Sequence, residues 1–264
     1  MKRILFLILL TAILFASCKK DTVLQYNPNI TGELSVEFDN VAGAADLQLK
    51  TGSYKNATGE TFKVSMLKYF VSNFKLTKTD GTVYVVPQDS CYFLIDESAL
   101  KTHQPILKVP EGEYKTLTFT LGVDSLRNTM DIKNRTGNLD PAGIAAGMYW
   151  AWNSGYIFFK MEGTSAASTQ SNNAFLYHIG LYGGRDMRTI NNIKTITLDL
   201  ATRGAPQIKV GKKTNVHLMV DILKMFNGST NISIALNPVV MISPFSANIA
   251  NNYTAMFTHD HTEN

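Results

Sequence analysis

Three of the chain's five histidines stand where an imidazole could bind a metal ion. His259 and His261 are two residues apart in the terminal segment MFTHDHTEN. Side chains two apart on an extended chain point the same way, so both rings can reach one ion. His178, in FLYHIGL, is expected on the strand face opposite Tyr177, where Gly180 leaves space beside it. Because imidazole is a good ligand for copper and zinc, these three residues are candidate ligands.

The other two histidines are not expected to bind metal. His217 lies in NVHLMVD, on the face opposite Val216 and Leu218, and is interpreted as a hydrogen-bonded residue of the sheet surface. His103 lies in LKTHQPIL, a polar loop, and is interpreted as solvated. Both residues therefore serve as controls for any histidine-bound metal.

Both tryptophans of the chain stand in one aromatic segment, GMYWAWNSGYIFFKMEG, at 147–163. Trp150 and Trp152 share a face if the segment is extended. The pattern is compatible with a core wedge between two sheets or with an oxidisable pair near a metal. It is also compatible with a stacking platform for a sugar ring, to which Tyr149 would contribute.

Oxygen-bearing side chains gather in and beside the loop at 125–146, and the set is Asp124, Asn128, Asp131 and Asp140. Such loops can bind Ca²⁺, but the spacing matches no EF-hand, and a role in Asx turns is the favoured interpretation. The sequence contains no nucleophile elbow, phosphate loop or zinc-protease motif, so we expect a protein that is not an enzyme.

The elements that must position these residues are predicted to be strands. ELSVEFDNV (33–41) alternates apolar and polar residues, and Asp80-Gly81 signals a hairpin turn. Similar short runs recur along the chain, while 125–146 and 221–228 suggest only helical turns in loops. The predicted fold is all-β, an antiparallel β-sandwich or barrel-like single domain.

The N-terminus carries the features of a lipoprotein leader. Residues 1–17 combine two basic residues with a short apolar run, and Cys18 follows small residues, as in a lipidated cysteine. We expect a signal peptide at 1–17, a lipidated cysteine and tether at 18–32 and a β domain at 33–264. Lys19-Lys20-Asp21 resembles the export signal of Bacteroidota surface lipoproteins. The expected location is the bacterial outer membrane, on its periplasmic face or the cell surface.

Scattered Lys and Arg argue against a nucleic-acid partner.

Four stretches together resemble the MbnP family of copper-binding proteins, which includes MopE and CorA: LGVDSLRN, LDPAGIAAGMYWAWNSGYIFFKMEG, FLYHIG and NIANNYTAMFTHDH. The resemblance implies a mainly β domain that binds copper as Cu(I) through two histidines. It also implies an oxidised tryptophan, kynurenine, two residues before the first histidine. A dihaem cytochrome c peroxidase-like partner is expected to make that modification.

Carried onto this chain, the family's first histidine ligand is His178, and the second falls on His259 or His261. The chain departs from the family at the kynurenine position, where Leu176 stands. The third ligand therefore stays open: it is absent, or the second terminal histidine, or an oxidised Trp150 or Trp152.

The resulting hypothesis is a lipid-anchored copper-binding protein of the envelope, acting in copper acquisition, storage or delivery. The alternative is a surface glycan-binding lipoprotein that uses Tyr149, Trp150 and Trp152 as its platform. A third hypothesis is a structural envelope module without a small ligand.

Overall fold

The computed structural model describes residues 25–150, 153 and 155–264. The predicted leader, Cys18 and Trp152 lie outside these residues. No helix in the described part of the chain is long and apolar enough to cross a membrane.

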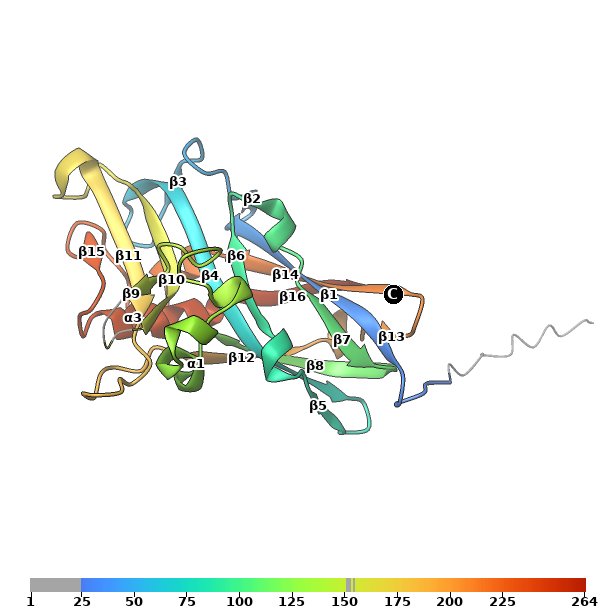
Figure 1. Cartoon of the computed structure of the whole chain (residues 1–264). Coiled ribbons are helices and arrows are strands. Elements are labelled where there is room, and N and C mark those ends of the chain that lie inside the picture. The colour runs from blue at the N-terminus through green and yellow to red at the C-terminus, as the bar shows by residue number, and fades with distance from the viewer. Residues whose placement is uncertain (1–24, 151–152, 154) are drawn as a thin grey trace, which may run out of the picture.

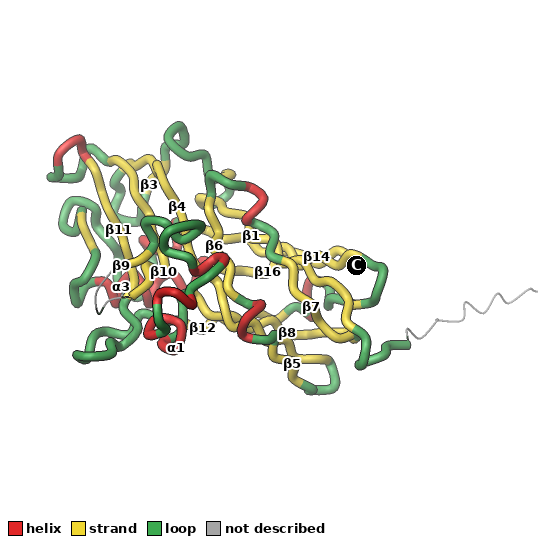
Figure 2. Tube along the Cα trace, in the orientation of Figure 1, coloured by secondary structure: helices red, strands yellow, loops and turns green. Residues whose placement is uncertain are grey.

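Two β-sheets make up the described domain (Figures 1 and 2). The smaller sheet has the order β16 (Phe257–Glu263), β14 (Lys213–Asp221), β1 (Thr31–Ala42) and β2 (Ala45–Asp46), with β7 (Ile106–Pro110) also paired to β1. The larger sheet has the order β12 (Lys194–Asp199), β8 (Gly112–Leu121), β4 (Thr61–Lys78), β10 (Gly155–Thr164), β11 (Ala174–Gly180) and β15 (Val239–Val240). Its short additional strands are β3 (Tyr54–Lys55), β5 (Val83–Val85), β6 (Tyr92–Asp96), β9 (Tyr149–Trp150) and β13 (Gln207–Ile208).

Helices are few and short. The described α-helices are α1 (Ser125–Thr129), α2 (Leu223–Phe226) and α3 (Ser246–Asn252). α1 and α2 lie in the two loops where the sequence predicts helical turns, whereas α3 falls in a segment for which the sequence gives no helical signal. The all-β prediction is confirmed, and the sheets are mixed: β1 pairs parallel to β14, and β11 pairs parallel to β15.

Period-2 alternation makes these segments strands and aims their side chains. In β14 the buried residues are Thr214, Val216, Leu218 and Val220, while the residues between them are partly exposed. β11 follows the same rule, with Phe175, Tyr177 and Ile179 buried. Successive side chains on a strand point to opposite faces, so an apolar set on one face leaves the other face to polar residues.

Aromatic rings join the two sheets. Phe38 of β1 meets Phe119 of β8 edge to face, with ring centroids 5.6 Å apart. Phe257, the first residue of β16, meets Phe119 at 5.2 Å and Tyr69 of β4 at 6.0 Å. Each such pair contributes about 0.5–1.5 kcal/mol beyond the burial of its area. The C-terminal strand is therefore docked on the core.

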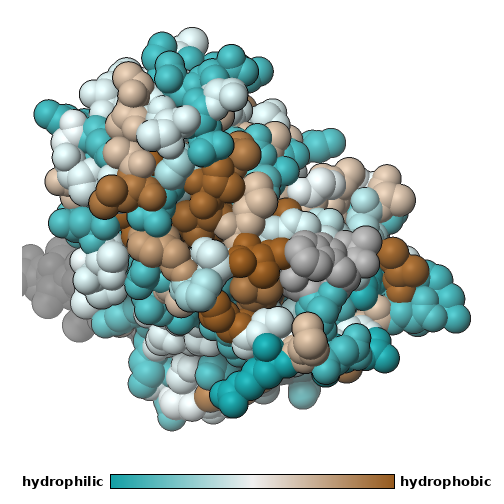
Figure 3. All heavy atoms as spheres, turned by 90° about the vertical axis from the view of Figure 1, so that its left-hand side faces the viewer, coloured by the Kyte–Doolittle hydropathy of each residue, from teal (hydrophilic) through white to brown (hydrophobic). Residues whose placement is uncertain are grey.

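Glu60, just before β4, holds the segment that leads into β15. Its carboxylate accepts hydrogen bonds from the backbone N–H groups of Ile234 (2.7 Å) and Ala235 (2.9 Å). The Ser233 hydroxyl and the Asn56 amide also donate to it. Burial alone would raise the pKa of Glu60, but these donors outweigh it and lower the pKa to about 2. Figure 3 shows this end of the molecule, where apolar side chains gather among polar ones.

We predict that Glu60→Gln lowers the free energy of unfolding by about 1–2 kcal/mol near neutral pH, after allowance for solvent screening of this partly exposed group. The folded pKa of about 2 lies below the ordinary value of 4.5, so the stabilisation is present above pH 4.5 and is lost as the pH falls through 2. Denaturant unfolding of both proteins as a function of pH measures the effect. A stability difference that stays constant down to about pH 2 would contradict the prediction.

Candidate metal centre

His178 lies on the outward face of β11 and is largely covered. Its side chain is 12% exposed, and its Nε2 lies 2.8 Å from Oε1 of Glu162. Glu162 belongs to the neighbouring strand β10, where Lys160 also contacts the carboxylate at 3.4 Å. In the antiparallel register, Lys160 is opposite His178 and Glu162 is opposite Leu176. The imidazole is therefore held by a diagonal partner across the strand pair.

The protonation states of this pair follow from burial and charge. Burial lowers the pKa of His178, and the hydrogen bond with Glu162 only partly opposes it. Burial would raise the pKa of Glu162, but the hydrogen bond with His178 and the charge of Lys160 outweigh it and lower that pKa. Near neutral pH the pair is therefore a neutral imidazole beside an ionised carboxylate.

Trp150 approaches the same face of β11. It is the last residue of β9, pairs with Gly155 and packs partly buried against the core. A Cβ built on Gly180 would lie 2.8 Å from Cζ3 of the Trp150 ring. Gly180 is two residues beyond His178, so the indole lies beside the strand face that carries the imidazole. The space that the sequence predicts beside His178 is thus occupied by tryptophan.

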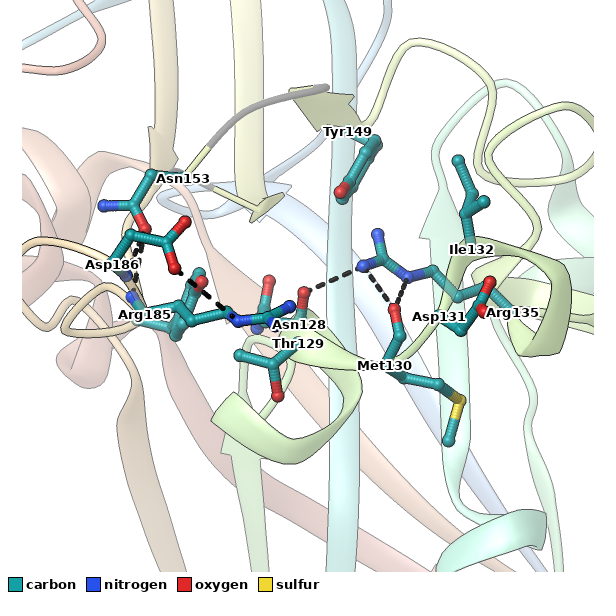
Figure 4. A pocket seen from close by; sticks show the side chains of 11 residues that line it. Asn128, Thr129, Met130, Asp131, Ile132, Arg135, Tyr149, Asn153, Arg185 and Asp186 are labelled. Atoms are coloured by element: carbon teal, nitrogen blue, oxygen red, sulfur yellow. Dashed lines mark hydrogen bonds and ion pairs between the residues drawn. The ribbon is translucent and has the colours of Figure 1, made fainter.

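Tyr149 is partly buried, and its ring already packs against two other side chains. The Arg135 guanidinium stacks 4.5 Å from its ring centroid, and Tyr156 meets it at 5.1 Å. Figure 4 shows Arg135 reaching from its loop toward Tyr149, with its hydrogen bonds to the carbonyl oxygens of Asn128 and Met130. These residues line a polar cavity of about 580 Å³. The packing of Tyr149 and Trp150 supports the wedge interpretation over the sugar platform.

The three acidic residues in and beside the loop act as a helix cap and as turn formers. Asp124 accepts from the Arg127 N–H at the start of α1 and from the Tyr92 hydroxyl. Asp131 and Asp140 each accept a backbone N–H two residues on, from Lys133 and Ala142. These contacts are those of Asx turns and helix caps, which is the interpretation that the sequence favours.

The terminal histidines lie on β16, in the smaller sheet, whereas His178 lies in the larger one. His259 faces inward, is 8% exposed, and its Nε2 lies 2.9 Å from Oγ1 of Thr262. His261 faces outward beside Asp260, with Nδ1 2.8 Å from Oδ2. In the described part of the chain, these two histidines do not join His178 in a cluster of three or more ligand groups. Their role as partners of His178 stays a prediction.

Sequence reasoning missed two features. The position of Glu162 could have been predicted, because Lys160 and Glu162 are two residues apart and therefore share one face of the strand that precedes FLYHIGL. The proximity of His217 to Asp260 and His261 could not, since it depends on which strands pair.

Comparison with known proteins follows this geometry. The MbnP family model matches residues 31–242. The structure is similar to a solved structure of MbnP from Methylosinus trichosporium, with a TM-score of 0.53 and 17% sequence identity, over 82% of this chain and 87% of that chain. At this identity the structural likeness shows a shared fold. No curated protein sequence matches the chain.

We predict that Gly180→Ala destabilises the protein by about 1–3 kcal/mol, because the new methyl group collides with the Trp150 ring and the Tyr156 carbonyl. Near-ultraviolet circular dichroism should show a change in the tryptophan bands. Ile179→Val, on the opposite face of β11, is the control: it should cost about 0.5–1.5 kcal/mol and leave those bands unchanged. Unchanged tryptophan bands in Gly180→Ala would contradict the contact.

Proposed function

The chain belongs to the MbnP family, and on that premise we propose that it is a copper-binding protein of the bacterial envelope. It takes copper as Cu(I), is held to the membrane by lipid on Cys18, and acts in copper acquisition, storage or delivery. His178 is the ligand that the geometry supports best. The contact between His178 and Glu162 carries the proposal.

An ionised carboxylate can only accept a hydrogen bond, so Glu162 selects the tautomer in which Nε2 of His178 carries the hydrogen. The lone pair is then on Nδ1, which has no hydrogen-bond partner among the residues that the structure describes. Histidines that bind metals are usually arranged in this way, with one nitrogen on the metal and the other donating to a carboxylate. Burial favours the neutral ring, which is the form that binds copper.

The remaining ligands follow from what lies beside His178. Leu176 occupies the same face of β11 and offers no donor, so the family's kynurenine position cannot contribute. Trp150 lies beside that face through its contact with Gly180. An oxidised Trp150 would bring a nitrogen or oxygen donor there, and a dihaem cytochrome c peroxidase-like protein is the proposed oxidising partner. Cu(I) accepts low coordination numbers, so few ligands are needed in addition to His178.

We predict that His178→Ala loses most of the Cu(I) that the unchanged protein binds. The measurement is a competition titration with a chromophoric Cu(I) chelator under reducing conditions. Glu162→Gln should keep the site and weaken it by about 10–100-fold, because the amide no longer fixes the imidazole as a carboxylate does. Intact mass of the same samples reports any oxygen added to tryptophan.

His103→Ala is the matched control for this titration. His103 contacts the carbonyl oxygen of Asp96 at 3.1 Å and lies 3.5 Å from Glu97, away from β11. The variant should bind Cu(I) as the unchanged protein does. If His178→Ala keeps the full affinity for Cu(I), His178 is not the residue that corresponds to the family's histidine ligand.

The anchor is tested separately, on Cys18→Ala. Multiple acyl chains hold a protein stably to a membrane, so the unchanged protein should sediment with membranes and the variant should not. Mass spectrometry of the mature N-terminus should show acyl groups only on the unchanged protein. Membrane association that survives Cys18→Ala would remove the lipid from the proposal and leave copper binding untouched.

A further inference from the structure

We propose that His217, Asp260 and His261 form a second metal site. The site binds divalent ions of the first-row transition metals, and among these it binds Cu(II) most tightly. This inference does not rest on the Cu(I) site at His178. The match to the family model ends at residue 242, before Asp260 and His261. The proposal assigns His261 to this second site instead of the predicted role as a partner of His178.

The cluster is made by strand pairing. β16 runs antiparallel to β14, and His261 is opposite His217. The next matched pair is His259 with Leu218, so Asp260 is an extra residue at a β-bulge. A bulge re-aims side chains and here leaves Asp260 between the two imidazoles on the outward face.

The distances are those of a site that can close on an ion. Oδ2 of Asp260 lies 2.8 Å from Nδ1 of His261 and 3.3 Å from Nδ1 of His217. One ligand atom from each residue lies within 4.8 Å of the other two. An ion about 2.0–2.2 Å from each of three ligands holds them roughly 3–4 Å apart. Small side-chain rotations are therefore enough to bring all three onto one ion.

Further carboxylates face the outer ring nitrogens. Oδ2 of Asp39, on β1, lies 3.5 Å from Nε2 of His217, and Oε1 of Glu263 lies 3.7 Å from Nε2 of His261. Each imidazole thus presents Nδ1 to Asp260 and Nε2 to a second carboxylate. With Nδ1 on a metal, Asp39 and Glu263 would accept the Nε2 hydrogens and orient the rings, so they are positioning residues.

The local charge favours a cation. Asp39, Asp260 and Glu263 bring three carboxylates to the cluster. Arg203 contacts one of them, with Nη1 3.5 Å from Oδ1 of Asp260. Two imidazoles and a carboxylate make a borderline ligand set, which suits divalent copper, zinc or nickel, and Cu²⁺ binds tightest among these ions.

The site is both accessible and held in place. The His261 side chain is 48% exposed, so an ion can enter from solvent, whereas that of His217 is only 16% exposed. The end of the chain is fastened: the Asn264 side chain accepts from the Gln207 N–H at 2.6 Å and donates to the Ala205 carbonyl at 3.1 Å. His261 and Asp260 are therefore on an ordered strand and not on a loose tail.

The test uses the purified full-length protein carrying His178→Ala, which removes the proposed Cu(I) ligand. Titration with Cu(II), followed by calorimetry and electron paramagnetic resonance, should show one bound ion per chain with hyperfine coupling to two imidazole nitrogens. Zn(II) should compete for the same site. Electron paramagnetic resonance that shows no nitrogen coupling would overturn the proposal.

Three further changes on this background locate the ligands. His217→Ala, His261→Gln and Asp260→Asn should each weaken Cu(II) binding by at least about tenfold, and the two histidine variants should each lose one nitrogen coupling. His261→Gln changes a half-exposed side chain, so its melting temperature should match that of its parent. Glu37→Gln is the control, since Glu37 stands opposite His217 on β1 but accepts from Asn215.

The outcomes for the two sites are separable. A chain with His217→Ala and His261→Gln but with His178 intact should keep Cu(I) and lose Cu(II), which supports the second site. If that chain binds Cu(II) as tightly as the unchanged protein, the second site does not exist. If His178→Ala alone abolishes Cu(II) binding, the ion belongs to the His178 site and the inference is wrong.

Discussion

The aromatic core between the two sheets is the constraint on which the rest of the structure depends. Phe38 and Phe257 from the smaller sheet pack edge to face against Phe119 from the larger one. These rings occupy the inward face of the strands that carry them, so the side chains of adjacent residues point outward. β11 and β14 follow the same alternation, with Tyr177 and Val216 buried, so the candidate ligands His178 and His217 lie on the outer faces beside carboxylates.

That placement gives the outward imidazoles a common arrangement. His178 is held by Glu162, His217 by Asp39 and Asp260, and His261 by Asp260 and Glu263. The hydrogen bond with His261 lowers the pKa of Asp260, and the hydrogen bond with His178 helps to outweigh the burial that would raise the pKa of Glu162. His259 is the inward exception: it contacts a hydroxyl, and its buried Nδ1 has no hydrogen-bond partner in the described part of the chain. Burial lowers the pKa of this ring. The strand register, more than the residue type, decides which histidines can present a nitrogen to an incoming ion.

What could be predicted from the sequence is what depends on neighbours along the chain. Alternation correctly predicted the buried faces of 33–41 and of the strands around His178 and His217. The parallel pairing of β1 with β14 joins residues about 180 positions apart, as Val36 and Val216 show, and no local pattern encodes it. The bulge at Asp260 is equally non-local, since it exists only relative to β14. For this reason the sequence predicts no metal-binding role for His217, although it correctly predicts that the His217 side chain points outward.

The two proposed sites differ in chemistry because they differ in neighbours. Beside His178 on the same face lie the apolar groups Leu176, Gly180 and the Trp150 ring. The one carboxylate that contacts the imidazole there is Glu162, and Lys160 opposes its charge at 3.4 Å. Few donors and low charge suit a monovalent, soft ion. Three carboxylates contact His217 and His261, and Arg203 contacts one of those carboxylates, Asp260. A divalent ion gains more from this negative charge than a monovalent ion does. As proposed, the two sites lie on different sheets and have no ligand in common. The two proposals therefore assign separate ligands to copper in its two oxidation states.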